Sequence, residues 1–286
     1  MDKLEQLRGI LRSYRSCVVA YSGGVDSVFL AMVARQELGD KALAAIADSA
    51  SLPRRELDEA LEIGERFGFP VRVVKTAEFN NPEYLKNPQN RCYFCKSELF
   101  TELELLARSE GFAVIAYGEN ASDVGDYRPG AKAAGEFQVR APLKEAGLTK
   151  AEIREYSATL GLPTADKPQM ACLSSRIPYG EAVTPEKLRM IEAAENALRD
   201  FGFYDVRVRH HELKNGQLAR IEVGAEELPK LFANGASIKV VSACKMAGYT
   251  HATVDLEGYR RGSLNSFSGA GGKSQSLTGS GTGTPS

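Results

Sequence analysis

The stretch Ser22-Gly23-Gly24-Val25-Asp26-Ser27 combines residue types that can bind a phosphate group. An apolar run precedes it and an amphipathic run follows it, which predicts a strand, a tight glycine turn and a helix. The two glycines let the backbone approach a ligand, and the helix start offers unpaired N–H groups at the positive end of its dipole. Ser22 and Ser27 add hydroxyl donors, and the Asp26 carboxylate can bind Mg²⁺.

This motif differs from the Walker A loop, which ends in Gly-Lys-Ser or Gly-Lys-Thr. It resembles the PP-loop of ATP pyrophosphatases, in which the loop holds the pyrophosphate of ATP while a substrate oxygen attacks the α-phosphate. The resemblance implies that Ser22, Gly23, Gly24, Val25, Asp26 and Ser27 bind ATP and Mg²⁺, and that pyrophosphate leaves. A glycine turn with a capping serine is the simpler alternative, but six matching residues between a strand and a helix favour ATP binding.

The cysteines form a second constellation. Cys92 and Cys95 are a C-x-x-C pair, and thiolates at this spacing can share a zinc ion or an iron–sulfur cluster. The sequence has no second C-x-x-C pair, and Cys172 as a sole third ligand suits a [4Fe–4S] cluster with one open iron. A thioredoxin-like redox pair and three unrelated thiols are the alternatives. Cys17 and Cys244 fit core positions.

Arg207 and Arg209 alternate with valines, so both guanidinium groups are expected on one face of a strand. Two arginines on one face can bind a phosphate or a carboxylate. The residues alone favour the simpler interpretation, a solvated strand face.

Apolar and amphipathic runs alternate through the first half of the chain. After a helix over 2–14, we expect strands at 17–21, 42–47, 71–74 and 112–117, separated by helices that include 54–67 and 99–107. This alternation predicts an α/β fold with a doubly wound parallel sheet. Ligands of such sheets bind beyond the carboxyl ends of the strands, so Asp48 and Gly118 become further candidates for ATP binding. For Asp48 a helix cap or turn is an equal alternative.

Residues 119–147 read as an irregular polar segment of functional importance, and a helix with a capping box follows over 149–160. A helix over 184–200, strands at 205–210 and 218–223, a helical stretch over 226–247 with a break near 234–235, and a strand at 252–256 predict a small α+β domain. We therefore expect domains at 1–181 and 182–262. The Ser/Gly-rich tail 263–286 is expected to be disordered.

Composition restricts the function further. The 286 residues are 43% hydrophobic and 26% charged with a net charge of −1, so no overall basic field predicts a nucleic-acid partner. No apolar run reaches the roughly 18 residues of a membrane span. The first residues are too acidic and polar for a signal peptide, so we expect a cytoplasmic protein with reduced, metal-bound or catalytic cysteines.

Together, these residues resemble the LarE family of ATP-dependent sulfur insertases, which help to build the nickel-pincer nucleotide cofactor of lactate racemase. The resemblance spans roughly residues 2–265 and goes beyond the PP-loop. It is carried by Ser22–Ser27, Asp126-Tyr127-Arg128-Pro129-Gly130, Cys172-Leu173-Ser174-Ser175-Arg176-Ile177-Pro178-Tyr179-Gly180, Val206-Arg207-Val208-Arg209 and Gly258-Tyr259-Arg260-Arg261-Gly262.

The resemblance implies a reaction in two stages. A carboxylate of pyridinium-3,5-biscarboxylic acid mononucleotide is adenylylated, and sulfur then replaces the activated oxygen. In one branch of the family a single cysteine, matching Cys172, gives up its own sulfur. In another branch three cysteines, matching Cys92, Cys95 and Cys172, hold a [4Fe–4S] cluster that carries sulfide from a sulfur donor. The three-cysteine pattern of this chain fits the second branch better, with Cys172 and Asp26 as catalytic residues.

The family also places an acid and paired arginines near the substrate phosphate, matching Glu195, Arg207 and Arg209. Arg128 and Arg176 lie in the family-specific stretches and are further substrate-binding candidates. Family members assemble as homo-oligomers, often hexamers. Another PP-loop enzyme, such as a tRNA thiolase or a synthetase or amidotransferase subunit, and a metal-binding module without catalysis remain alternatives.

Overall fold

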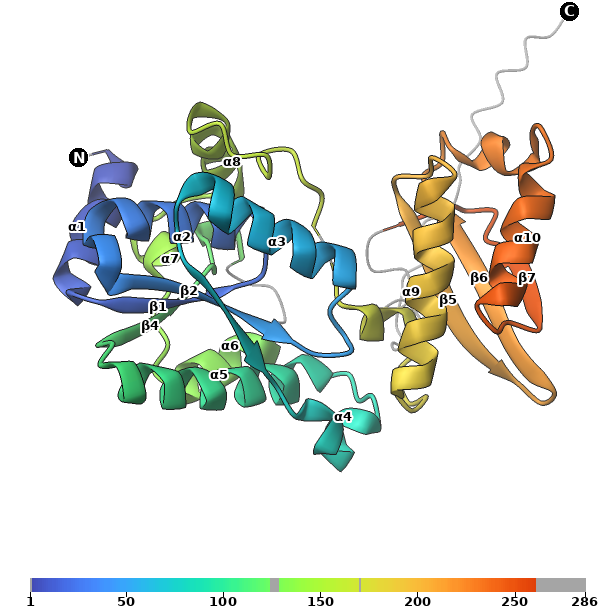
Figure 1. The fold of residues 1–286 in the computed structure, drawn as a ribbon, viewed down its shortest axis with the longest axis horizontal. Helices are drawn as coiled ribbons and strands as arrows, with labels where there is room; N and C mark the ends of the chain where they lie inside the picture. Colours follow the sequence, from blue (N-terminus) through green and yellow to red (C-terminus); the bar gives the residue numbers. More distant parts are fainter. Residues whose placement is uncertain (1, 124–128, 170, 261–286) are drawn as a thin grey trace, which may run out of the picture.

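The structure is a computed structural model of the chain, and it describes residues 2–123, 129–169 and 171–260. Two sheets with their own helices lie side by side (Figure 1). The strands are β1 (Cys17–Tyr21), β2 (Ala42–Asp48), β3 (Val71–Lys75), β4 (Val114–Tyr117), β5 (Val206–Leu213), β6 (Gly216–Val223) and β7 (His251–Val254). The helices are α1 (Lys3–Tyr14), α2 (Val25–Leu38), α3 (Arg54–Phe67), α4 (Pro82–Leu85), α5 (Arg91–Glu110), α6 (Pro129–Glu136), α7 (Pro142–Glu145), α8 (Lys150–Thr159), α9 (Pro185–Asp200) and α10 (Ala236–Met246). Short 3₁₀ turns are η1 (Gly39–Lys41), η2 (Glu78–Asn80), η3 (Ala121–Asp123), η4 (Leu173–Arg176) and η5 (Leu228–Phe232).

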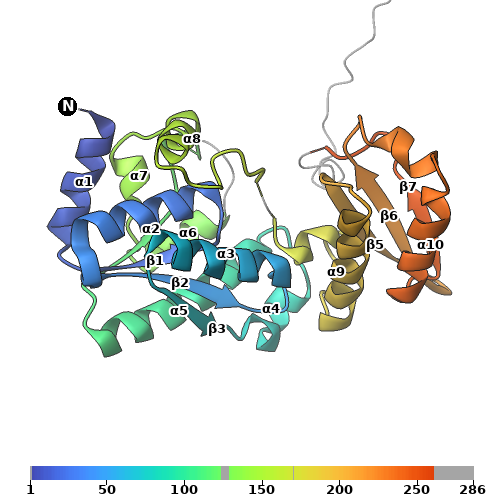
Figure 2. The same cartoon turned by 45° about the horizontal axis from the view of Figure 1, so that its top comes forward.

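The first sheet has the strand order β3-β2-β1-β4, and all its pairs are parallel. Helices cover both of its faces, with α1, α2 and α3 on one side and α5 and α6 on the other (Figures 1 and 2). The predicted α/β fold with a doubly wound parallel sheet is therefore confirmed. The carboxyl ends of β1, β2 and β4 lie at one edge, where the loops that follow them meet.

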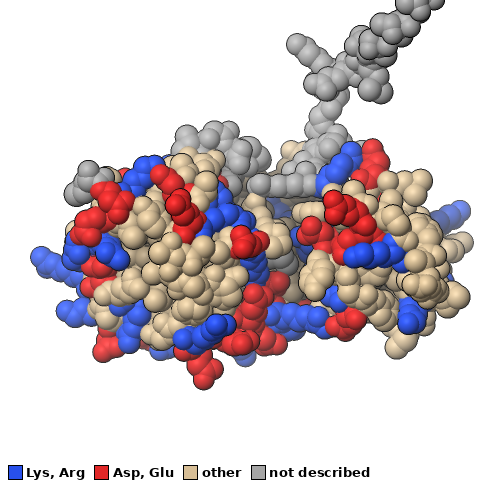
Figure 3. Space-filling model, turned by 90° about the horizontal axis from the view of Figure 1, so that it is seen from above, with Lys and Arg blue, Asp and Glu red and all other residues tan. Residues whose placement is uncertain are grey.

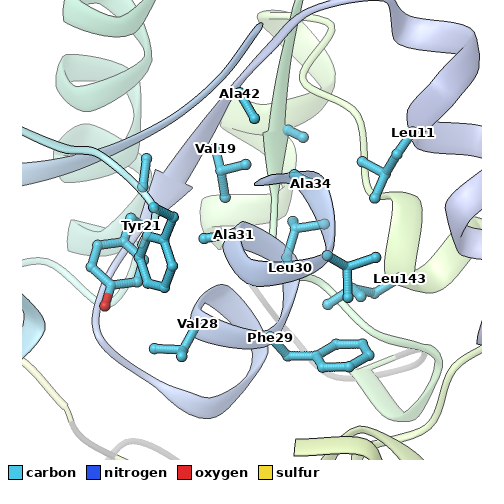
Figure 4. Close-up of a cluster of buried hydrophobic side chains, with 14 of the residues drawn as sticks. Leu11, Val19, Tyr21, Val28, Phe29, Leu30, Ala31, Ala34, Ala42 and Leu143 are labelled. Carbon is cyan, nitrogen blue, oxygen red and sulfur yellow. The ribbon is translucent and has the colours of Figure 1, made fainter. Parts of the chain in front are cut away.

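Alternation along β1 explains why this sheet carries helices on both faces. Val19 and Tyr21 pack into a core with α1, α2, α3, α7 and α8, whereas Val18 and Ala20 pack into a second core with α5 and α6. Figure 4 shows the first core, with Phe29 and other side chains of α2 enclosed. A strand that is apolar on both faces has no solvated side, so it requires a helix layer above and below.

The second sheet is built from β5, β6 and β7, with β5–β6 antiparallel and β6–β7 parallel. Its apolar face packs on α9 and α10 through residues that include Leu198, Val206, Ile221 and Val240. Period-two alternation sends Arg207 and Arg209 of β5 and Glu222 of β6 to the opposite face, and all three are buried. The expectation of a solvated strand face is therefore wrong.

Several helices and strands have other boundaries in the structure than those expected from the sequence. The segment 119–147, expected to be irregular, contains η3, α6 and α7 in its described part, because Pro129 and Pro142 each begin a short helix. The helix expected over 99–107 begins at Arg91. The stretch 226–247 is split into η5 and α10 at Gly235, whose φ of +71° cannot continue a helix. The strand expected at 252–256 runs from His251 to Val254.

The tail 263–286 and Arg128 lie outside the described residues. Within the described parts of the chain, no helix combines the length and apolarity that a membrane crossing requires.

His210 generates a prediction about pH. The side chain is fully buried on β5, its Nδ1 lies 3.3 Å from the Tyr249 hydroxyl, and its Nε2 has no hydrogen-bond partner among the described residues. Burial, followed by the charge of Lys187, lowers its pKa to about 4. Since an unfolded histidine titrates near 6.5, the unfolded chain binds more protons between pH 4 and 6.5, and the free energy of unfolding falls as pH drops through that window.

We expect His210→Asn to reduce this pH dependence, because asparagine keeps a polar atom near the Nδ1 position but has no ionisable ring. His211, whose pKa burial and Arg220 also lower, retains part of the slope. Urea unfolding at several pH values measures the effect, and His251→Asn on an exposed part of β7 is the matched control. Equal slopes for wild type and His210→Asn would contradict the prediction.

Candidate active site

The predicted phosphate loop lies between β1 and α2, as the sequence pattern requires. The Ser27 hydroxyl accepts a hydrogen bond from the Ser22 N–H at 3.1 Å and donates to the Gly24 carbonyl at 3.0 Å, which closes the turn. Gly24 is the N-cap residue of α2 and provides no side chain to the helix start. The first N–H groups of a helix have no intrahelical acceptor, so those of α2 are available to a ligand.

Close packing around this loop leaves little room for a side chain at two glycines. Gly23 has a φ of +70°, and a Cβ atom there would lie 2.9 Å from the Cβ of Ala60 on α3. Gly118 follows β4, and a Cβ atom there would lie 3.1 Å from the Cβ of Asp26. The carboxyl ends of β1 and β4 therefore meet at the phosphate loop, and Gly118 lies beside Asp26, as expected for a parallel sheet.

Asp26 has partners on both carboxylate oxygens. Lys150 Nζ lies 2.5 Å from Oδ2, and Asn120 Nδ2 lies 3.3 Å from Oδ1. Asp48 lies elsewhere, at the end of β2, where Arg54 Nη1 contacts its Oδ1 at 2.5 Å. Asp48 is thus committed to an ion pair with the start of α3 and is not among the residues that line the cavity described next.

A cavity of about 520 Å³ connects the loop with the cysteines. Its walls come from the start of α2, the start of α3, the α4–α5 region, η3, the start of α8 and the segment before η4. The lining residues are Ser22, Gly24, Val25, Asp26, Leu52, Pro53, Glu56, Tyr84, Arg91, Cys92, Cys95, Lys96, Ser122, Asp123, Lys150, Pro168, Gln169, Ala171 and Cys172. One cavity therefore contains the predicted Mg²⁺ ligand and all three cysteines of the predicted cluster site.

Cys92 and Cys95 lie about one helical turn apart at the start of α5, and Cys172 is the N-cap residue of η4. Burial raises the pKa of the Cys95 thiol to about 12, with further contributions from Glu78 and Cys172. Cys92 is more exposed than Cys95, but desolvation by the surrounding protein, followed by the charge of Cys172, also raises the pKa of its thiol. The three thiols are thus close enough for ionisation of one to oppose ionisation of another.

A metal centre would relieve this repulsion, since a coordinating thiol is deprotonated by the metal charge. No group of three or more His, Cys, Asp or Glu side chains within the described residues is arranged to hold a single metal ion. A cubane is bound differently, because each thiolate binds a different iron and the thiolates surround a cluster rather than a point. Three cysteines around one cavity fit that donor set, with Arg91 adding a compensating positive charge.

The Cys172 segment is fixed against α4 and α5 by buried hydrogen bonds. Arg91 donates to the Asn87 side chain and to the Ser174 carbonyl, the latter at 3.1 Å. The Tyr84 hydroxyl lies 2.8 Å from the Ser174 hydroxyl, and Asn87 Nδ2 donates to the Pro178 carbonyl at 2.7 Å. These contacts place Cys172 beside the C-x-x-C pair.

The predicted substrate-binding residues form a second polar centre next to this segment. Arg176 donates two hydrogen bonds to Glu195 at 2.8 and 3.0 Å, and both side chains are fully buried. Burial alone would raise the pKa of Glu195, but the charges of Arg176, Arg199 and Arg207 outweigh it and lower that pKa. Arg176 and Glu195 thus neutralise each other in this structure.

Arg209 and Arg207 differ in their partners. Arg209 donates to Glu222 at 2.7 Å and to the Ser175 carbonyl at 3.1 Å. Arg207 donates to the Val206 carbonyl, and its guanidinium lies 4.8 Å from the centre of the Tyr259 ring. Within residues 2–123, 129–169 and 171–260, no carboxylate lies within ion-pair distance of Arg207. Burial, followed by the charge of Arg176, lowers its pKa.

Sequence reasoning missed Tyr84, Arg91, Lys96 and Lys150 as residues of the cavity. Arg91 and Lys96 flank the C-x-x-C pair, and basic residues beside thiols are a usable signal. Lys150 carries no such signal, because its partner Asp26 is distant in the sequence.

No family model matches the chain, but known proteins are similar to it over most of its length. A pyridinium-3,5-bisthiocarboxylic acid mononucleotide synthase of Lactiplantibacillus plantarum is 32% identical over 92% of this chain and 94% of that protein. The chain belongs to the LarE family. An uncharacterised protein of Synechocystis sp. is 44% identical over 92% of this chain and 97% of that protein. The B subunit of a glutamine-hydrolysing GMP synthase of Methanopyrus kandleri is 26% identical over 68% of this chain and 65% of its own length.

Membership of the LarE family confirms the resemblance inferred from the loop, the cysteines and the arginine strand. The weaker similarity to GMP synthase subunits agrees with the α/β PP-loop fold seen in the first sheet.

The geometry of Gly23 predicts a specific loss of stability. Gly23→Ala is expected to lower the free energy of unfolding by at least about 1–2 kcal/mol, because the backbone is left-handed there and the new methyl group meets Ala60. Gly9→Ala is the matched control: Gly9 lies in α1, no atom lies within 4 Å of the place that its new methyl group would take, and alanine there gains up to about 1 kcal/mol in helix propensity. Urea unfolding measures both, and a Gly23→Ala protein as stable as wild type would refute the packing argument.

Proposed function

We propose that this chain is an ATP-dependent sulfur transferase acting on pyridinium-3,5-biscarboxylic acid mononucleotide, which it converts toward the thiocarboxylate used in the nickel-pincer cofactor of lactate racemase. The name of the Lactiplantibacillus relative supports this substrate class. The observation that carries the proposal is the single cavity lined by both the phosphate loop and the three cysteines. An ATP site alone would explain the loop but would leave the three thiols without a role.

In the first step, a substrate carboxylate oxygen attacks the α-phosphorus of ATP, the bond to the pyrophosphate oxygen breaks, and an acyl-adenylate and pyrophosphate form. The N–H groups at the start of α2 bind the pyrophosphate portion, and Asp26 would hold Mg²⁺, for which carboxylate oxygens are suitable ligands. In the second step, sulfide attacks the activated carbon, the carbon–oxygen bond breaks, and AMP leaves.

Cys92, Cys95 and Cys172 would hold a [4Fe–4S] cluster, which when bound supplies an open iron site able to carry sulfur. The alternative within the family is that Cys172 itself gives up its sulfur. Convergence of all three cysteines on one cavity supports the cluster, because the sacrificial route requires Cys172 alone. Arg91 stabilises negative charge at this position, since its guanidinium is buried beside Cys172 and Cys92.

We propose that Arg207 and Arg209 bind the phosphate of the substrate. We also propose two domains, one at 1–181 that binds ATP and one at 182–262 that binds the substrate. A buried guanidinium with no carboxylate partner among the described residues, as at Arg207, is well suited to an anionic ligand. Charges of both signs are interspersed on the face shown in Figure 3, so we propose no nucleic-acid partner. A homo-oligomeric state and a cytoplasmic location stay predictions.

The function is tested by separating its two steps. We expect wild type, prepared anaerobically, to be brown with about four irons per chain, to release pyrophosphate only with the mononucleotide present, and to turn over repeatedly with sulfide. Asp26→Ala is expected to abolish pyrophosphate release. Cys92→Ala, Cys95→Ala and Cys172→Ala should each lose the iron and the sulfur transfer but keep adenylylation.

Cys244→Ala is the matched control, because Cys244 is buried in the core of the second sheet and does not line the cavity. Substrate-independent pyrophosphate release would refute the proposed substrate. A colourless enzyme that forms one product per chain, with Cys172 lighter by the mass of H₂S, would show the sacrificial route instead.

The phosphate assignment is tested at Arg207. Arg207→Ala together with Arg209→Ala is expected to raise the substrate KM tens-fold per arginine and to leave ATP binding nearly unchanged, since a hydrogen bond to a charged group contributes about 1.5–3 kcal/mol. Arg207→Lys separates charge from geometry, because lysine cannot form the bidentate contact. A wild-type KM in the double variant, with circular dichroism showing the native fold, would exclude these arginines as phosphate ligands.

A further inference from the structure

The chain that follows β7 turns back and is fastened to β6. The Asp255 N–H donates to the Ile221 carbonyl at 2.9 Å, and the Tyr259 N–H donates to the Val223 carbonyl at 2.7 Å. Gly258 lies between these two anchors with a φ of +69°, and a Cβ atom there would lie 2.9 Å from the Val223 carbonyl oxygen. The backbone of this segment is therefore fixed on both sides of Gly258, and with it the place from which the Tyr259 side chain extends.

The Tyr259 ring lies where a carboxylate is missing. Arg207 is directly opposite Glu222 in the antiparallel pair of β5 and β6, but that carboxylate pairs with Arg209 at 2.7 Å and with Arg220 at 3.2 Å. The Arg207 guanidinium instead lies over the Tyr259 ring, 4.8 Å from its centre. At this distance the electrons of the ring face attract a cation.

This contact leaves the hydrogen-bonding capacity of Arg207 almost unused. A guanidinium has five N–H donors, and within the described parts of the chain only Nη1 of Arg207 has an acceptor, the Val206 carbonyl at 2.8 Å. A carboxylate partner would occupy two of these donors in a bidentate pair, whereas an aromatic ring attracts the charge without accepting a conventional hydrogen bond. The ring thus holds the cation and leaves its donors for a ligand.

Packing and repulsion both point to the same role for this tyrosine. Tyr259 is half-buried and is not a member of the apolar core beneath the second sheet, so burial of the ring in that core does not explain it. Arg207, in contrast, needs an attractive neighbour, because burial and the charge of Arg176 both oppose its charged form. Without the ring, a long and flexible side chain would turn away from that repulsion.

We propose that Tyr259 is a positioning residue of the phosphate site, whose ring holds the Arg207 guanidinium in place for the phosphate of the mononucleotide. This inference rests on the proposed phosphate site and adds a residue that acts through Arg207. A side chain that is already held in its binding position loses less conformational freedom when the ligand binds. Loss of the ring is therefore expected to weaken binding of the mononucleotide and to leave the use of ATP unchanged.

The test is calorimetric binding of pyridinium-3,5-biscarboxylic acid mononucleotide to the full-length protein. Tyr259→Leu keeps apolar bulk but removes the ring, and it is expected to bind the mononucleotide roughly five- to ten-fold more weakly. Tyr259→Phe keeps the ring and should bind within about two-fold of wild type. In pyrophosphate release, Tyr259→Leu should raise the KM for the mononucleotide by the same factor, with kcat and the KM for ATP nearly unchanged.

A double-mutant cycle with Arg207→Ala tests whether Tyr259 acts through Arg207. In the Arg207→Ala protein, Tyr259→Leu is expected to have no further effect on affinity, because the guanidinium that the ring holds is absent. An equal loss in both backgrounds would overturn the inference. Wild-type affinity in Tyr259→Leu would also overturn it, as would a Tyr259→Phe protein that binds as weakly as Tyr259→Leu.

Tyr204→Leu serves as the control, because Tyr204 lies just before β5, is 86% exposed and makes no ring contact with an arginine among the described residues. Thermal unfolding of every variant verifies the fold. Failure of wild type to bind the mononucleotide would overturn the proposed substrate. Unchanged affinity in Arg207→Ala would overturn the proposed phosphate site, and the inference falls in either case.

Discussion

The cavity depends on one buried guanidinium. Arg91 is only 4% exposed and joins Asn87 to the Ser174 carbonyl, so it holds the segment that follows Cys172 against the start of α5. A buried charge is tolerated only when its hydrogen bonds are satisfied, and the loss of one such hydrogen bond to a charged group costs about 1.5–3 kcal/mol. This requirement restricts the positions that the segment after Cys172 can adopt. Cys172 is distant from Cys92 and Cys95 in sequence, and this network brings the three together.

The same short segment also joins the two polar centres. Cys172 contributes to the cavity, whereas Ser175 accepts from Arg209 and Arg176 binds Glu195 on α9. Glu195 in turn accepts from the Val208 N–H of β5, so the segment, α9 and β5 are linked by one fully buried carboxylate. A displacement at η4 would therefore move the cysteine and the arginine strand together. The hydrogen bonds of this segment thus fix the position of Cys172 relative to Arg209 and Glu195.

The local sequence pattern predicted those features of the structure that are determined by residues close together in the sequence. The glycine turn at Ser22–Ser27, the alternation along β1 and β5, and the spacing of Cys92 and Cys95 each follow from a period of a few residues. The burial of Arg207 and Arg209 could not be predicted in this way. Their strand face is covered by Ser175 and Tyr259, and nothing local to β5 encodes those contacts. The pairing of Lys150 with Asp26 was missed for the same reason.

Charge distribution gives the arginine strand its chemical character. Five guanidinium groups, those of Arg176, Arg199, Arg207, Arg209 and Arg220, surround the two buried carboxylates of Glu195 and Glu222. Asp255 offsets one more positive charge at Arg220. Among the described residues two positive charges remain in excess: one is shared by Arg176 and Arg199 around Glu195, and the other is at Arg207, whose pKa is lowered by burial and by the charge of Arg176. A bound anion would stabilise the charged form of Arg207, whereas a neutral ligand would not, and this electrostatic asymmetry is the physical basis for the phosphate site that we propose at this strand.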